Sequence, residues 1–221
     1  QYLNMSSQQL YSLYVVMMIG SVAGLLTSAL TIDPKHLLMP LIISLALMAT
    51  GSVMDSFSNN LTRPENLYFS QFLLAFGSTF FVGPTMVLGP RNVLTNPRNL
   101  VSFSVLFGIC NNLGGLIGAA LLGTFQIVRE KFHSSQIVEH LTLSDPLVAA
   151  RVQSGGSAYG SLLADPNLRN LAGIRSLANA ATREANVLAY NDVFMLIAVI
   201  AVATMTWLTI RALWLMSTTK A

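Results

Sequence analysis

The sequence predicts an all-α membrane protein, a polytopic transmembrane helix bundle with five spans. Hydrophobic residues make up 53% of the chain and charged residues only 10%, whereas a soluble domain carries about 25% charged residues. The mean hydropathy is +0.60. Five windows contain no Asp, Glu, Lys or Arg at all: 1–32, 37–54, 66–90, 99–128 and 193–210. Since about 20 apolar helical residues cross the hydrocarbon core of a bilayer, each window reaches or approaches the length of a span.

The spans follow from these windows and divide the chain into three segments. We place them at about residues 10–31, 37–55, 67–89, 101–127 and 191–213. The first four lie within residues 1–128, and the fifth opens a last segment, 191–221, which ends in a tail. Pro84 lies inside the third span, where a missing N–H is expected to kink or locally unwind the helix. Pro90 is expected to close that span.

Basic residues in the short connections predict the orientation of the bundle, because cytoplasmic loops carry an excess of Lys and Arg. If the first span runs inward, the short outer loop 56–66 holds Arg63 alone. The inner side then holds five basic residues, namely Lys35, Arg91, Arg98, Arg211 and Lys220. We therefore expect a multi-pass protein with the N-terminus of this chain outside and its C-terminus in the cytoplasm.

The segment 129–190 is predicted to be helical and to lie on the outer side. Residues 129–141 extend the helix of the fourth span, and Asp145-Pro146 is typical of a helix start. The Gly-Gly pair within 153–157 predicts a break. Asp165-Pro166 begins another helix, which we expect to run through Tyr190 into the last span. Two interpretations stay open: a helical cap over the membrane domain, or a docking surface for a partner.

Small residues at four-residue spacing occur in two spans. Gly20 and Gly24 form one such pair, and Gly114 and Gly118 form another, with Gly115 beside it. Small residues let helix backbones approach closely in lipid. The pattern is typical both of static helix packing and of helices that slide during a conformational change, to which Gly83 and Pro84 would also contribute.

Polar side chains inside spans are candidates for lining a cavity. Asn111 and Asn112 are adjacent in the fourth span, and an amide in hydrocarbon needs a hydrogen-bond partner or a water-filled space. Thr79, Thr85 and Met86 flank the Gly83-Pro84 pair, where a helix break would favour an adaptable pocket. Interhelical hydrogen bonding explains the two asparagines equally well.

Ionisable residues give little sign of chemistry. No acid lies near the centre of a span, so we expect the main proton carrier of a proton-driven protein to lie outside this part of the protein. Asp192, at the outer end of the last span, is a candidate interfacial acid. The three histidines are scattered, and no phosphate-binding loop, HExxH or CxxC occurs. We predict no catalytic residue, cofactor or metal, and the dispersed basic residues argue against nucleic acid.

Several stretches of the chain resemble one family of transporters. They are the fourth span from Phe107 to Thr124, the stretch 132–142, the run Ala189-Tyr-Asn-Asp-Val-Phe194, and the turn from Gly20-x-x-x-Gly24 to Asp33-Pro-Lys35. They are similar to the fourteen-span drug:proton antiporters (EmrB/QacA type) of the major facilitator superfamily. Two departures concern named positions. Only Gly24, Asp33 and Lys35 match the family's loop motif, and Asn111 stands where many members carry arginine.

The resemblance implies a secondary active transporter of which this chain is a C-terminal fragment, the last five of fourteen helices and most of the C-terminal six-helix half. It implies proton-coupled multidrug efflux of toxic amphipathic compounds across a bacterial inner membrane by alternating access. The implied partners are the missing N-terminal half of the same chain, lipid, a small-molecule substrate, protons and a periplasmic adaptor protein. The alternative is a membrane scaffold or assembly subunit that transports nothing.

Overall fold

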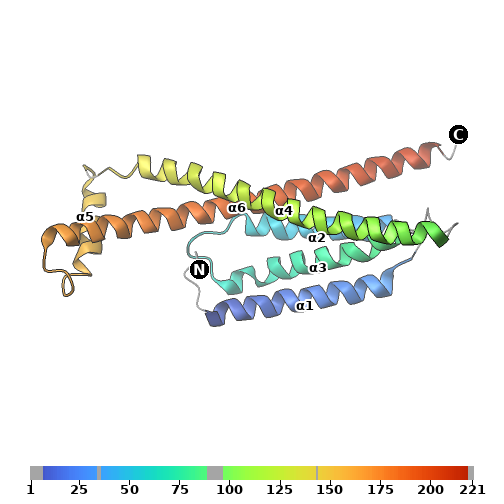
Figure 1. Cartoon of the computed structure of the whole chain (residues 1–221), viewed down its shortest axis with the longest axis horizontal. Helices are drawn as coiled ribbons and strands as arrows, with labels where there is room; N and C mark the ends of the chain where they lie inside the picture. Colours follow the sequence, from blue (N-terminus) through green and yellow to red (C-terminus); the bar gives the residue numbers. More distant parts are fainter. Residues whose placement is uncertain (1–6, 34–35, 89–96, 143, 219–221) are drawn as a thin grey trace.

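The computed structural model describes residues 7–33, 36–88, 97–142 and 144–218 (Figure 1). All regular structure in these ranges is α-helical, and no strand occurs among them. The helices are α1 (Ser7–Thr31), α2 (Leu38–Asp55), α3 (Pro64–Leu88), α4 (Pro97–Glu139), α5 (Pro146–Ser157) and α6 (Pro166–Thr218). Five of them, all except α5, are long and apolar enough to cross a membrane. The predicted helical class and the five membrane-length helices are thereby confirmed.

Two helices continue well beyond the membrane-length windows. α4 is a single helix of 43 residues that includes the fourth predicted span and the stretch after it. α6 is a single helix of 53 residues that begins at Pro166 and contains the last predicted span, as the sequence predicted. Asp145 and Asp165 precede α5 and α6, and their carboxylates accept from the backbone N–H groups of Leu147 and Asn167, each at 2.8 Å. These are N-caps, which satisfy donors that a helix start leaves free.

Pro84 does not unwind α3, so that part of the expectation was wrong. The helix continues to Leu88, and Pro90 lies outside the described residues. A proline removes the hydrogen bond to the carbonyl four residues earlier, here that of Phe80. Ser28 on α1 donates its hydroxyl to this carbonyl at 3.3 Å. A neighbouring helix thus replaces the bond that Pro84 lacks, which is how prolines are tolerated in membrane helices.

The predicted break at 153–157 was also wrong, because α5 is helical through Ser157. Its two glycines serve close packing instead. A Cβ on Gly156 would lie 2.5 Å from the carbonyl oxygen of Arg169 on α6, and one on Gly155 would lie 3.4 Å from the Cα of Gly173. The backbones of α5 and α6 therefore touch at Gly156, where a Cβ would not fit, whereas a Cβ on Gly155 would lie at ordinary contact distance.

The bundle is organised around α3, which packs extensively against both α1 and α2. Glycines shape both contacts: a Cβ on Gly20 of α1 would lie 2.9 Å from the carbonyl oxygen of Phe72, and one on Gly51 of α2 would lie 2.8 Å from that of Ser70. α2 also packs against α6, and α6 against α4, so the neighbours form the series α1–α3–α2–α6–α4 (Figure 1).

The chain passes from α2 to α3 at one end of the bundle. Beyond this end, the helices α4 and α6 continue side by side, and α5 lies at their far tip (Figure 1). We call residues 129–190 the helical extension. A hydrogen bond ties α6 to the bundle at the base of this extension, since the Asn191 side-chain amide donates to the Ser58 carbonyl at 2.7 Å. The extension is thus carried by two helices that also contribute membrane-length segments.

The glycine contacts between α1 and α3 predict an asymmetric response to adding a methyl group. Gly24→Ala is expected to lower the free energy of unfolding by about 1–3 kcal/mol, because the new Cβ collides with the backbone of α3 at Phe76. Gly118→Ala on α4 is the matched control, because no atom from elsewhere in the described chain lies within 4 Å of its added Cβ. Unfolding in detergent with increasing SDS, followed by circular dichroism, measures both. Equal stability of the two variants would contradict the close α1–α3 packing.

Candidate functional site

The predicted cavity residues on α3 have different surroundings from one another. Thr79 lies at the contact with α1, beside Gly24, and its hydroxyl donates to the Ala75 carbonyl at 3.0 Å. The Thr85 hydroxyl donates to the Val82 carbonyl at 2.7 Å. Met86 is 52% exposed. Both threonine hydroxyls therefore donate hydrogen bonds to carbonyl groups of their own helix. Met86 is the residue of this group whose side chain is exposed.

The membrane-length part of α4 is largely exposed in the described chain, although α4 also packs against α6. Its most apolar window contains no buried residue. Because successive residues of a helix are about 100° apart, small and polar residues gather on one side, namely Asn111, Gly114, Gly115 and Gly118. No atom from elsewhere in the described chain lies within 4 Å of the Cβ position of any of these three glycines. The opposite side is apolar, with Ile109, Leu113 and Leu116. We call the first side the Asn–Gly face.

The two asparagines of α4 are not equivalent. Both are exposed, but the Asn112 amide donates to the Gly108 carbonyl of its own helix at 3.0 Å. Asn111 makes no hydrogen bond with other described residues. α3 and α4 are not among the extensively packed helix pairs, so Thr85 and Asn111 do not meet in one site within the described chain.

Asp192 belongs to an ionic cluster that joins α6 to α4. Its Oδ2 atom accepts from Nε of Arg129 at 2.6 Å and lies 2.6 Å from Nε2 of His133. The Arg129 guanidinium also lies over the Phe132 ring, 4.7 Å from its centre. The side chains of Asp192 and Arg129 are 30% and 31% exposed. The cluster therefore fixes the two helices to each other where the membrane-length segments give way to the extension.

A neutral hydrogen bond runs beside this cluster. The Gln126 amide on α4 donates to the Asn186 side-chain oxygen on α6 at 2.9 Å, and Asn186 is 6% exposed. Sequence reasoning found Asp192 but missed these partners. The four-residue spacing of Arg129 and His133, which places both on one side of a helix, was the available signal.

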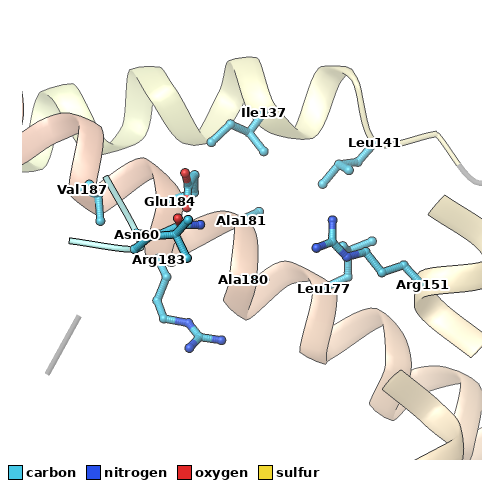
Figure 2. A pocket seen from close by; sticks show the side chains of 11 residues that line it. Asn60, Ile137, Leu141, Arg151, Leu177, Ala180, Ala181, Arg183, Glu184 and Val187 are labelled. Atoms are coloured by element: carbon cyan, nitrogen blue, oxygen red, sulfur yellow. The ribbon is translucent and has the colours of Figure 1, made fainter. Parts of the chain in front are cut away.

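A cavity of about 530 Å³ lies between the extension and the connection from α2 to α3, which contributes Asn60 and Leu61. Figure 2 shows Ile137 of α4 and Leu141, just beyond the end of α4, projecting toward α6, with Glu184 between the two helices and Arg151 of α5 at one end. Its walls are mostly apolar, and none of the predicted cavity residues lines it. The space has the volume of a small-molecule site, but it lies outside the membrane-length segments.

Neither the ionic cluster nor the rest of the described chain brings three or more His, Cys, Asp or Glu side chains into a metal-binding group. His133 and Asp192 supply two such groups, whereas protein metal sites with open positions typically use three protein ligands. The cluster is an ion-paired junction between helices.

Comparison with protein-family models, with curated proteins and with solved structures finds no match for this chain. Its class is therefore defined by its own fold and side chains. The chain is all-helical in its described residues and has five helices long and apolar enough to span a membrane, which indicates a membrane-embedded protein.

The ionic cluster predicts that Asp192→Asn weakens the junction between α4 and α6. We expect a loss of about 1–2 kcal/mol, the usual range for a partly buried, charge-assisted hydrogen bond. The control is Lys131→Gln, two residues from Arg129 and therefore on the other side of α4, where its 77% exposed side chain pairs with Glu130 at 3.4 Å. Loss of this pair should change stability by less than about 1 kcal/mol and leave the exchange of residues 180–192 unchanged. Hydrogen exchange of residues 180–192 gives a local readout, and unchanged protection in Asp192→Asn would argue against the cluster.

Proposed function

We propose that this chain is part of a secondary active transporter that exports toxic amphipathic compounds by alternating access, coupled to protons. The main support for this proposal is the exposed Asn–Gly face of α4. A polar amide at membrane depth needs protein or water beside it, and Asn111 has neither a hydrogen bond nor a packed neighbour among the described residues. A face of glycines allows another backbone to approach and slide.

The division of α4 into two unlike sides supports this assignment. Its Ile109–Leu113–Leu116 side suits lipid, whereas the Asn–Gly face suits a passage or a moving helix. In the proposed mechanism, Asn111 lines a water-filled path in one state, and the glycines form a close contact in the other. Substrate binds between two halves of the transporter near the middle of the membrane, as in other alternating-access proteins. In this proposal, an N-terminal half of the transporter supplies the opposite wall.

The helical extension supports a second part of the proposal. Two continuous helices carry it away from the bundle, and α5 is fixed at its tip by backbone contact with α6. A rigid projection of this kind suits docking of a periplasmic adaptor protein. In this proposal, the protein lies in the bacterial inner membrane with the extension on the periplasmic side.

Water access to α4 tests the transport proposal against a dry scaffold. Cys110 is first replaced, and single cysteines are placed at Asn111, Asn112, Thr85 and Met86 of the complete native protein in its membrane. We expect a membrane-impermeant maleimide to label Asn111→Cys most strongly, with a change of about twofold or more when an exported compound is added. Leu113→Cys, on the apolar side of the same helix, is the matched control and should remain unlabelled.

Uniform protection at these sites, with cysteines in the extension labelling well, would instead support the alternative of a scaffold or assembly subunit. Transport itself is measured in proteoliposomes of the complete protein. An imposed pH difference is expected to drive accumulation of an amphipathic dye such as ethidium, and absence of movement over a broad compound panel would rule out the transporter.

A further inference from the structure

Asp55, the last residue of α2, is a buried acid with neutral partners. Its side chain is 1% exposed. The carboxylate accepts hydrogen bonds from two neighbouring residues of α3, the Ser70 hydroxyl and the Gln71 amide, the latter at 2.6 Å. Among the described residues, no Lys, Arg or His forms an ion pair with Asp55. Buried charges in proteins are ordinarily paired or neutralised, so this carboxylate calls for a further explanation.

The charged groups on neighbouring elements are placed elsewhere. Arg63 and Glu65, beside the start of α3, are exposed. On α6, Asp192 is paired with Arg129 of α4. A negative charge at the C-terminal end of α2 also opposes the dipole of that helix. Within the described residues, the surroundings of Asp55 therefore supply hydrogen-bond donors but no ion-paired positive charge.

Ser70 can serve two protonation states of Asp55 without any change of backbone. Its hydroxyl has one hydrogen and two acceptors within reach, the Asp55 carboxylate and the Leu67 carbonyl at 3.0 Å. When Asp55 is ionised, Ser70 donates to it. When Asp55 carries a proton, the acid O–H donates to the Ser70 oxygen, and the Ser70 hydrogen turns to Leu67. A hydroxyl is both donor and acceptor, so both arrangements are fully bonded.

We propose that Asp55 is a proton-binding site between α2 and α3, and that Ser70 and Gln71 position its carboxyl group. One proton from water adds to a carboxylate oxygen to form a neutral acid, and its release restores the carboxylate. This assignment rests on the proposed proton-coupled transport. From the sequence alone, we expected the proton carrier to lie elsewhere, because no acid lies near the centre of a span. Asp55 lies at the end of a span.

The site lies where a proton can affect helix packing. One turn before Asp55, Gly51 brings the two helices together so closely that an added Cβ would lie 2.8 Å from the Ser70 carbonyl oxygen. Ser70 therefore belongs both to a close backbone contact of α2 with α3 and to the hydrogen bonds of Asp55. Loading the proton reverses the donor in the bond that joins these helices, which couples protonation to their contact.

The transport experiment uses the complete native protein in proteoliposomes, with ethidium as the probe. Asp55→Asn is expected to reduce accumulation driven by a pH difference by about tenfold or more, while exchange of ethidium at equal pH stays within about twofold of the wild type. The matched control is Asp165→Asn, an exposed N-cap at which asparagine caps equally well, and it should retain both activities. Accumulation at the wild-type rate in Asp55→Asn would overturn the inference.

Infrared spectroscopy tests the site without measuring transport. It remains informative even if Asp55→Asn abolishes both the pH-driven accumulation and the equal-pH exchange of ethidium. Infrared difference spectra between acidic and neutral pH should contain the carbonyl band of a protonated carboxylic acid, which Asp55→Asn removes. Ser70→Ala should shift the band, since the acid then loses its hydroxyl partner. Spectra in which Asp55→Asn removes no titrating band would refute the site. If the wild-type protein moves no ethidium, the transport proposal fails and the infrared result alone decides on Asp55.

Discussion

The close backbone contacts of α3 with α1 and α2 are the interaction on which the rest of the bundle depends. In lipid, apolar side chains gain little by leaving their solvent, so helices associate through tight packing and hydrogen bonds. Glycines at these contacts let the backbones touch, and buried serines fill the remaining space, among them Ser28, Ser44, Ser52 and Ser70. The Ser28 hydroxyl also completes the hydrogen bonding of α3 at Pro84. With α3 held on both sides, α2 is positioned to receive α6, which in turn carries α4.

Polar contacts between helices gather at one end of the bundle. The Asp192–Arg129–His133 cluster, the Gln126–Asn186 hydrogen bond and the Asp55–Ser70–Gln71 group all lie toward the end of the bundle where α2 meets α3. Each joins two helices by side chains whose burial is tolerable only when they are bonded. This end is therefore specified by hydrogen bonding, whereas the middle of the bundle is specified by shape.

Much of the fold was predictable because the membrane imposes a strong pattern on the sequence. Long windows without charge predicted the five membrane-length helices, and Asp-Pro pairs predicted the starts of α5 and α6. Pro84 and the glycines of 153–157 were misinterpreted, because their effect depends on a partner helix that no local pattern reveals. The same limit applies to the polar groups. Asp55 and Ser70 are 15 residues apart, and their contact exists only once α2 and α3 have packed.

The continuity of α4 and α6 has a mechanical consequence. Residues 166–190 of α6 form about 37 Å of unbroken helix at about 1.5 Å per residue. Because no loop separates this length from the membrane-length segment, it acts as a lever arm whose fulcrum is the junction at Asp192. A tilt of about 10° at the junction displaces the tip by about 6 Å over that length. A small change of tilt inside the bundle would thus become a much larger displacement at the tip of the extension.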